Sequence, residues 1–307
     1  MDTSRIAVRT SMKLRQLAYF RAVVEHHSLA AASEVLRVAQ PNLSVAIKQL
    51  EEEWGVSLFE RGGRGLTVTE TGRMLYERAG ELLNGASSLD QQMRAIGRGF
   101  TAHLRVGFTH VAIEVITAMI ARMREEGRTV SFSLHQGEPQ LLEAMVELRQ
   151  LDFAVTHMPV ANPGLGAEVR APMTIALLCR QGDDRWPTDG PIAPDALADV
   201  PLILLRRRSG TGIYERILDA FAAAGVPCSV LADSTDISAI YSLVERNVGL
   251  GLIPVRALDA PRAGFSMHPV ALLPAPEQLA LIYPRGHRQL PALQRAIDLC
   301  RTILRAG

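Results

Sequence analysis

The 307-residue chain is poor in lysine, carries almost no net charge and has no long hydrophobic run. Its basic residues are nearly all arginine, with Lys13 and Lys48 the only lysines, which indicates a coding bias rather than a phosphate-binding device. The net charge of +1 excludes a general electrostatic attraction to nucleic acid. No stretch approaches the roughly 18 apolar residues of a membrane span, and Met1 to Ser11 lack the apolar core of a signal peptide. We therefore expect a soluble, cytoplasmic protein with no membrane partner.

Cysteine is scarce as well, with only Cys179, Cys228 and Cys300. They have neither CxxC nor Cys/His spacing, so they predict no metal site. Two interpretations stay open, buried reduced thiols or a redox pair between Cys179 and Cys228. The sequence also lacks GxSxG, HExxH, GxGxxG and Walker patterns. We therefore expect no catalytic residue, no cofactor and no metal.

The first informative segment predicts two short helices followed by a hinge. Leu14, Leu17, Phe20 and Val24 recur at helical spacing, which predicts a helix from about Lys13 to Glu25. Ser28 can cap a second helix that runs through Leu36, and the hinge then covers Arg37 to Gln40. Such a pair is typical of proteins that present the next helix to the major groove of DNA.

A third helix is expected after the hinge, with Pro41 at its first position. Leu43, Ile47, Leu50 and Trp54 fall on one side of it, and the opposite side is polar. Amide and hydroxyl groups near its beginning can match base edges, and Lys48 can contact a phosphate. The alternative is that this polar face is only solvated. The predicted DNA contacts on this helix are Gln40, Pro41, Asn42, Ser44, Val45 and Lys48.

The segment from Leu58 to Thr69 predicts a wing, because three glycines separate two short strands. Arg61 and Arg64 lie at its tip, where they can reach a phosphate backbone or the minor groove. Thr67 completes the predicted DNA-contacting set. A phosphate-binding loop is a poor alternative because GxxxxGK[ST] is absent.

The stretch SLAAASEVLRVAQPNLSVAIKQLEEEWGVSLFER, followed by LTVTETG, resembles the winged helix-turn-helix of LysR-type transcriptional regulators. The resemblance runs from about Lys13 to Gly72 without a gap. Two positions depart from the family pattern: Ala39 stands where a capping Ser is usual, and His27 stands where Gly is common. Loss of a cap weakens the start of the third helix by about 1 kcal/mol and leaves the fold intact. The resemblance implies a DNA-binding domain over residues 1–72.

Between Thr71 and Gly97, apolar residues recur at alternating spacings of four and three, which predicts a heptad seam. Gly80 and Gly85 weaken this helix. The alternative is that the helix packs on its own effector domain. Through the resemblance, residues 73–100 form the linker helix of a homodimer or homotetramer that reads a two-fold symmetric site. The seam consists of Leu75, Ala79, Leu82, Ala86, Leu89, Met93 and Ile96.

From His103 onward, short apolar runs alternate with helical segments, which indicates α/β units around mainly parallel sheets. LDFAVTH, ALADVPLIL and LVERNVGLGLIP also resemble segments of the LysR-type effector domain. That resemblance implies a two-lobed, periplasmic-binding-protein-like domain over residues 101–307. Lobe one is expected at 102–173 plus 277–307, and lobe two at 174–276. The expected helices are Ile113–Glu126, Gln140–Gln150, Gly212–Ala224, Ile237–Asn247 and Leu290–Leu304.

Ligands of such sheets bind at the carboxyl ends of strands, beside helix amino-termini. The row Arg206 to Arg208 favours a small anionic effector such as a carboxylate. Thr109, Ser209 and Thr235 could instead be plain helix caps, and the histidines could be ordinary loop residues. The predicted effector contacts are Thr109, His110, Gly137, Glu138, Thr156 and His157 in lobe one, and Arg208, Ser209, Thr211, Thr235 and Asp236 in lobe two.

The sequence as a whole predicts an α+β multidomain chain: a winged helix-turn-helix, a long linker helix and a two-lobed α/β effector domain. The expected function is transcription regulation, with promoter DNA, a small-molecule effector and RNA polymerase as partners. A free-standing solute-binding protein with a dimerisation arm is the alternative, and the missing export signal speaks against it. The effector, the target genes and the choice between activation and repression stay open.

Overall fold

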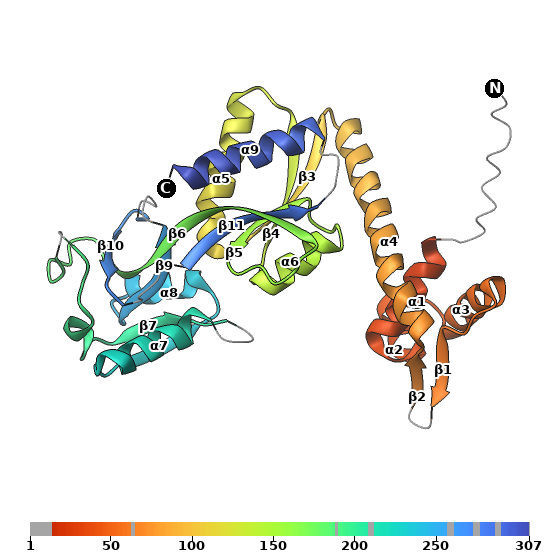
Figure 1. Ribbon diagram of the computed structural model, residues 1–307, viewed down its shortest axis with the longest axis horizontal. Coiled ribbons are helices and arrows are strands. Elements are labelled where there is room, and N and C mark those ends of the chain that lie inside the picture. The colour runs from red at the N-terminus through yellow and green to blue at the C-terminus, as the bar shows by residue number, and fades with distance from the viewer. Residues whose placement is uncertain are drawn as a thin grey trace. The chain divides into compact units, whose positions relative to one another are not determined.

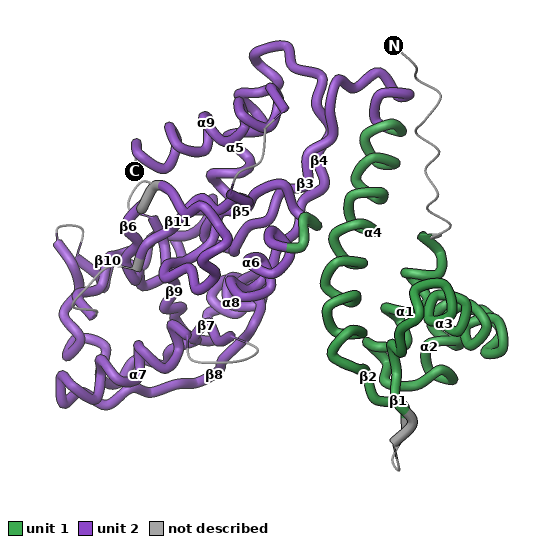
Figure 2. The backbone as a smooth tube through the Cα atoms, turned by 45° about the vertical axis from the view of Figure 1, so that its right-hand side comes forward, with its two compact units in different colours: residues 1–94, 148–150 green, residues 95–147, 151–307 purple. Residues whose placement is uncertain are grey.

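The computed structural model describes residues 14–62, 65–187, 190–207, 212–256, 261–272, 277–285 and 290–306. The chain divides into two compact units, shown in separate colours in Figure 2. Unit 1 comprises residues 1–94 and 148–150, and unit 2 comprises residues 95–147 and 151–307. None of the helices in the described ranges is both long and apolar enough to cross a bilayer.

The described part of unit 1 starts with three helices and a two-stranded wing (Figure 1). The Ser28 side chain caps the second helix by accepting a hydrogen bond from Ala31 N at 3.4 Å, as predicted. Arg37 ends that helix in the left-handed conformation, with φ 53°. The elements are α1 (Leu14–His26), α2 (Leu29–Leu36), α3 (Gln40–Trp54), β1 (Phe59–Gly62) and β2 (Gly65–Val68).

The core of unit 1 lies between these helices and the wing. Leu17 and Phe20 of α1 and Leu43 and Leu50 of α3 are fully buried, and Phe59 packs 5.4 Å from the Phe20 ring. Two details of the predicted third helix are corrected. Pro41 is its second residue, because Gln40 already has helical geometry. Trp54 is 36% exposed, because the helix ends there and its last turn passes beyond the core.

Helix α4 (Glu70–Gly97) is the predicted linker helix. The structure corrects the beginning of the seam, because Ala79 is fully buried in the core of unit 1 and Leu75 packs against the same core. These two side chains therefore cannot face a partner helix. Farther along, Leu82, Leu89, Met93 and Ile96 are each about half exposed, between 48% and 58%.

Unit 2 is built on a sheet in the order β4-β3-β5-β11-β6-β9-β7-β8, with β10 paired to β6. Strands β3, β4 and β5 are parallel to one another, as are β7, β8 and β9. The pairs of β11 and β6 are antiparallel, so the expected mainly parallel sheets are in fact mixed. The strands are β3 (Ala102–Phe108), β4 (Val130–Gln136), β5 (Phe153–His157), β6 (Leu165–Arg180), β7 (Leu202–Leu205), β8 (Val230–Ser234), β9 (Leu250–Arg256), β10 (Phe265–Val270) and β11 (Glu277–Pro284).

All five predicted helices of this region are present, and their observed starts differ from the expected ones by at most one residue. Two short 3-10 segments, η1 (His110–Ala112) and η2 (Pro194–Leu197), precede α5 and α7. The helices are α5 (Ile113–Glu125), α6 (Pro139–Glu147), α7 (Ile213–Ala224), α8 (Ile237–Glu245) and α9 (Pro291–Arg305).

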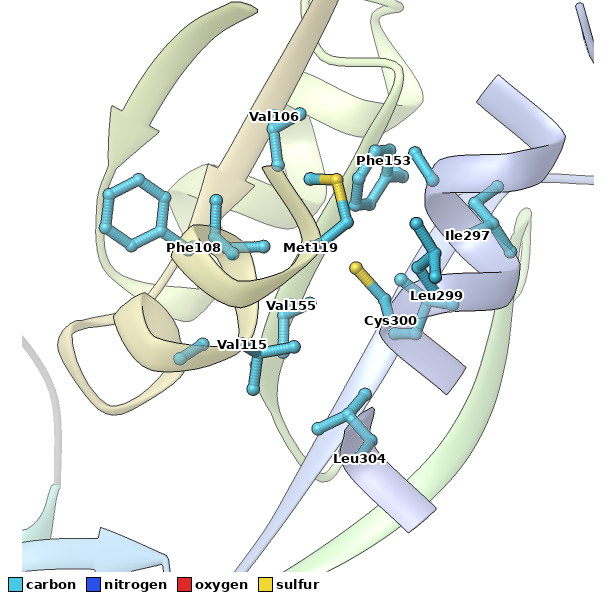
Figure 3. Close-up of a cluster of buried hydrophobic side chains, with 14 of the residues drawn as sticks. Val106, Phe108, Val115, Met119, Phe153, Val155, Ile297, Leu299, Cys300 and Leu304 are labelled. Atoms are coloured by element: carbon cyan, nitrogen blue, oxygen red, sulfur yellow. The ribbon is translucent and has the colours of Figure 1, made fainter. Parts of the chain in front are cut away.

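Two large apolar cores occupy unit 2. One includes Met119, Phe153 and Ile297 and lies between the sheet and helices α5 and α9 (Figure 3). The other surrounds β7 and β9 and is covered by α7 and α8. The long strand β6 belongs to both, because Met173 packs in the first core and Ile175 in the second. The predicted domain and lobe boundaries remain predictions.

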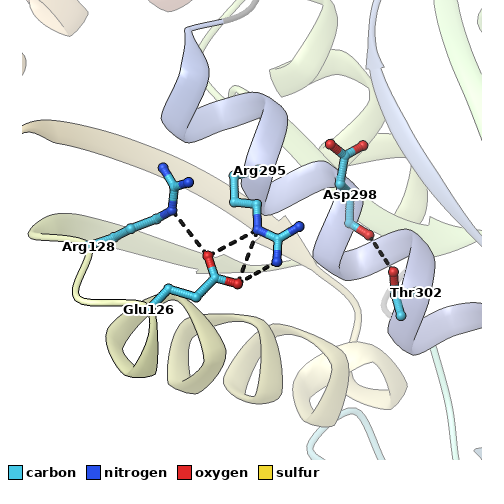
Figure 4. A network of polar contacts seen from close by, with 5 residues as sticks. All are labelled: Glu126, Arg128, Arg295, Asp298 and Thr302. Carbon is cyan, nitrogen blue, oxygen red and sulfur yellow. Dashed lines mark hydrogen bonds and ion pairs between the residues drawn. The ribbon is translucent and has the colours of Figure 1, made fainter.

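An ion-pair network ties the end of α5 to α9 (Figure 4). The Glu126 carboxylate accepts hydrogen bonds from Arg295 Nε at 3.0 Å and Arg128 Nε at 3.1 Å, and also from Arg295 Nη2. These bonds, led by those of Arg295, lower the pKa of Glu126 to about 2.

Candidate functional site

The first candidate site is the outer face of α3. Asn42, Ser44 and Lys48 are exposed, and so are Gln40, Pro41 and Val45, while Leu43 and Ile47 on the other side are buried. Lys48 Nζ lies 3.4 Å from Glu52 Oε1, with both side chains mostly exposed. The structure thus brings the predicted DNA contacts of this helix together on one solvent-facing surface.

Two polar contacts hold α3 in place. Gln16 of α1 donates from Nε2 to Gln49 Oε1 at 3.1 Å, so Gln49 takes part in packing α1 against α3. Glu51 Oε1 accepts hydrogen bonds from Leu58 N at 2.7 Å and Phe59 N at 3.3 Å. Glu51 therefore joins the helix to the wing, a role that the periodicity of the sequence does not reveal.

The beginning of α3 lacks a side-chain cap. Ala39 occupies the N-cap position and makes no such bond, as the departure from the family pattern predicted. The wing strands pair antiparallel, with Glu60 opposite Thr67 and Arg61 opposite Leu66. Thr67 is exposed. The predicted anchor Arg64 and the side chain of Arg61 lie outside the described residues.

The second candidate site is a cleft of about 490 Å³ in unit 2. It lies at the carboxyl ends of β3, β4, β7 and β8, where the following helices begin, as expected for an open α/β sheet. Six of the predicted effector contacts line it. They are Thr109, His110, Gly137, Glu138, His157 and Thr235.

Two other predicted contacts do not line the cleft. Thr156 lies inside β5 and not after it, and its fully buried hydroxyl has no hydrogen-bond partner among the described residues. Asp236 is the N-cap of α8, where its Oδ1 accepts from Ser238 N at 2.8 Å. The remaining three, Arg208, Ser209 and Thr211, lie outside the described residues.

Several residues of the cleft lining are not among the predicted effector contacts. Arg206 and Arg207 directly follow β7 and belong to the arginine row that indicated an anionic effector, and Gln136 is the last residue of β4. The position of Gln136 at a strand end is a signal that could have identified it. The apolar wall carried no such signal, because its members belong to strands and helices whose core-facing sides look alike in sequence. It consists of Pro139, Leu141, Leu205, Ile213, Ile237 and Pro254.

The arginine wall of the cleft is built against the start of α7. Arg206 Nη1 lies 3.9 Å from Asp233 Oδ2, and its guanidinium stacks 5.0 Å from the centre of the Tyr214 ring. Arg207 passes so close to Gly212 that a Cβ there would lie 2.8 Å from Arg207 Cδ. The Gly212 amide donates to Glu215 Oε2 at 2.7 Å, which is the main cause of the lowered pKa of Glu215. The charges of Arg206 and Arg207 lower that pKa further.

The opposite wall carries two histidines and a buried threonine. The His110 and His157 rings are 6.2 Å apart and tilted by 53°. Thr109 takes the N-cap position of η1, but its side chain makes no capping hydrogen bond. Helix capping therefore does not explain why a threonine stands at this position. Its hydroxyl is buried and has no hydrogen-bond partner in the described ranges. The cleft therefore offers cations, hydroxyls and imidazoles beside an apolar wall.

The three cysteines are free thiols outside the cleft lining. Burial raises the pKa of Cys179 to about 11 and that of Cys300 to about 12, and it raises the pKa of Cys228 as well. Within the described part of the chain, no group of three or more His, Cys, Asp and Glu side chains could hold a metal ion.

The two regions of the chain that carry these sites both match known protein domains. Residues 14–73 match the bacterial regulatory helix-turn-helix protein, lysR family, and residues 97–305 match the LysR substrate binding domain. The HTH-type transcriptional regulator BsdA of Bacillus subtilis is 27% identical over 245 residues, which cover 80% of this chain and 84% of BsdA. BudR of Raoultella terrigena, another regulator of this type, is 27% identical over 284 residues, covering 90% of this chain and 96% of BudR.

Solved structures show the same fold. The LysR family regulator CbnR superposes with a TM-score of 0.62 over 95% of this chain and 99% of CbnR, at 21% identity. Full-length CbnR bound to its target DNA superposes equally well. The expected resemblance and fold class are thereby confirmed, and the named relatives are regulators and not enzymes. Matched along both its helix-turn-helix and its substrate-binding region, this chain belongs to the LysR family of transcriptional regulators.

Proposed function

We propose that the chain acts in the cytoplasm as a homodimer or homotetramer that binds an interrupted palindrome near a promoter. A small anionic metabolite in the cleft changes lobe or subunit geometry, which alters the bend of the DNA and the contact with RNA polymerase. The observation that carries the effector part is the composition of the cleft: its described lining contains two arginines, Arg206 and Arg207, and one carboxylate, Glu138.

The anionic character of the effector follows from charge and from backbone geometry. With both histidines neutral, the two arginines and one glutamate of the described lining leave it a formal charge of +1. Helices α7 and α8 start beside the cleft, and helix amino-termini favour negative charge. The apolar wall suits the carbon skeleton of the ligand, and the volume of about 490 Å³ is that of a metabolite site.

The movement of the effector domain rests on a division into two lobes, 102–173 plus 277–307 and 174–276. The two apolar cores support this division, because one ends at Met173 and resumes at Leu279, while the other runs from Ile175 to Leu272. The chain then passes between the lobes twice, within β6 and between Leu272 and Leu279. A bound ligand that touches both lobes favours one relative orientation.

DNA recognition is assigned to the exposed face of α3. Gln40, Asn42 and Ser44 contact base edges, and Lys48 contacts a phosphate. Arg61 and Arg64 of the wing anchor the backbone. CbnR, whose fold this chain shares, was solved with its target DNA, which supports the same use of the domain here.

Gel shift with the DNA upstream of the protein's own gene tests this assignment. Arg64→Ala is expected to weaken binding to every sequence and to reduce the salt slope by about 1. Ser44→Ala is expected to change the preferred sequence, at about 1–3 kcal/mol for the affected base pair. The reverse pattern would exchange the two roles, and no sequence-specific shift with or without metabolites would refute DNA recognition by this surface.

Thermal shift of the full-length protein against small carboxylates and their neutral amides tests the effector class. A carboxylate at a hundred times its Kd is expected to stabilise the protein by about 2.7 kcal/mol. Arg207→Gln should abolish that stabilisation, whereas Arg124→Gln, on the exposed face of α5, should preserve it. Calorimetry in which only neutral or cationic compounds bind would refute an anionic effector.

A further inference from the structure

Gly80 stands in the interior of α4, where glycine disfavours a helix, and the structure supplies a reason for it. A Cβ built at Gly80 would lie 2.7 Å from Arg21 Nη1 and 3.4 Å from Arg21 Cζ. Arg21 belongs to α1, so its guanidinium lies in a notch of the linker helix beside Gly80, and a side chain at this position would force the end of Arg21 to shift. Gly85, by contrast, has nothing within 4 Å of such a Cβ.

Arg21 is held in the notch by two partners. Its Nη2 donates to Glu25 Oε1 at 2.8 Å and lies 3.4 Å from the Tyr76 hydroxyl. The Tyr76 hydroxyl itself donates to Glu25 Oε1 at 2.9 Å. The guanidinium also stacks on the Tyr76 ring, 4.7 Å from its centre, and the Arg21 side chain is only 15% exposed. Arg21 and Glu25 of α1 and Tyr76 of α4 therefore all contact one another, which joins the two helices.

A second contact fixes the start of the same helix on the wing. Thr69 Oγ1 donates to Ser57 O at 2.8 Å and accepts from Gly72 N at 2.9 Å. A Cβ at Gly72 would clash with Leu58 O, so the helix approaches the wing backbone closely. Gly72 and Gly80 are separated by about 12 Å along a helix axis, and two fixed points determine the direction of a rod.

We propose that Arg21 is a positioning residue that sets the direction in which α4 leaves the DNA-binding domain, and thereby the spacing between the two half-sites that a dimer selects. This inference rests on the proposed dimer, which pairs through the exposed part of α4 and reads DNA with α3. The remaining helix beyond Gly80 is roughly 25 Å long, so a change of about 10° moves its end by about 4 Å. That displacement is close to the rise of one base pair, about 3.4 Å.

In vitro selection with the full-length protein and a randomised double-stranded DNA library tests the proposal without a known operator. Wild type and Gly85→Ala are expected to select one dominant half-site spacing. Gly80→Ala places a methyl group 2.7 Å from the present position of Arg21 Nη1 and therefore displaces the guanidinium. This should shift or broaden the selected spacing by at least about one base pair, with affinity for a single half-site changed by less than about twofold. Both substitutions raise helix propensity equally, so they are matched.

Further variants separate positioning from general damage. Arg21→Gln should reproduce the effect of Gly80→Ala, and Gly80→Ala added to Arg21→Gln should change nothing more. Arg78→Gln removes the same charge from an exposed site on α4 and should keep the wild-type spacing. Tyr76→Phe retains the ring and removes only the hydroxyl bonds, so it provides the test if Gly80→Ala does not fold.

The two proposals fail differently in this experiment. An unchanged spacing in Gly80→Ala, or in Tyr76→Phe where that variant replaces it, would overturn the role of Arg21 and leave the dimer intact. Selection of single half-sites by the wild type would overturn the proposed dimeric recognition and this inference with it.

Discussion

Arg105 and Asp152 form a buried ion pair that joins β3 to the residue preceding β5 at three points. Asp152 Oδ1 accepts from Arg105 Nη2 at 2.8 Å, and Asp152 Oδ2 accepts from Arg105 N at 2.7 Å. Asp152 N donates to Arg105 O at 2.9 Å. Because Arg105 is only 8% exposed, its charge needs compensation inside the protein, and Asp152 supplies it.

Asp152→Asn should therefore destabilise the protein by about 3 kcal/mol, because it leaves a buried guanidinium without its counter-charge. Urea denaturation followed by circular dichroism measures the effect. The control is Asp90→Asn, which breaks the exposed pair with Arg94 and should cost about 0.5 kcal/mol or less. Equal losses in the two variants would contradict the importance of burial.

Acid should weaken the network around Glu126. Its folded-state pKa of about 2 lies below the ordinary 4.5, so the carboxylate stabilises the folded state above pH 4.5 and loses that contribution as pH falls toward 2. The difference in urea midpoint between wild type and Glu126→Gln should thus be constant from pH 7 to about 5 and shrink below that. A difference that grows on acidification would contradict the assigned direction.

Ala39→Ser should supply the missing cap of α3. A serine hydroxyl at this N-cap position can accept an amide hydrogen bond, which stabilises a helix by about 1 kcal/mol. Thermal unfolding measures the gain, which should appear without loss of DNA binding. Ala223→Ser, at an exposed position within α7, should instead lower stability by about half a kcal/mol or less.

The cysteines should differ in reactivity. A pKa of about 11 leaves Cys179 on the order of 0.1% thiolate at pH 8, and Cys300 less still. Cys228 is only half-buried and should react first with a thiol-specific reagent, so Cys228→Ala should react slowly until the protein is unfolded. An intramolecular disulfide formed under mild oxidant would favour the alternative of a Cys179–Cys228 redox pair.

Leu89→Glu should disrupt the proposed dimer. Leu89 is 58% exposed on α4, and a symmetric dimer would bury two copies of the introduced charge. The dimer Kd is expected to rise at least about 100-fold, or about 2.7 kcal/mol, in sedimentation experiments. Met74→Glu changes a residue that is equally exposed, at 61%, but outside the predicted seam, and it should leave the Kd unchanged.

Much of the architecture could be predicted locally. Ser28 caps α2 where the sequence indicated, and the helices that follow β7 and β8 start within one residue of expectation. The pairing of strands could not be predicted in the same way, because β6 and β11 meet across more than a hundred intervening residues. The expectation of mainly parallel sheets failed for that reason, and β10 was not foreseen at all.

The sequence by itself determined the family, the helix with the exposed polar face and the strand ends that carry the cleft. These depend on periodicity, capping and turn residues, which act between neighbours a few positions apart. Only the tertiary structure decided that Ala79 is buried within its own chain, that Thr156 lies inside a strand, and that Arg21 fills the notch at Gly80. Those facts depend on which side chain, distant in the sequence, packs beside each residue. Only the folding of the complete chain brings such side chains together.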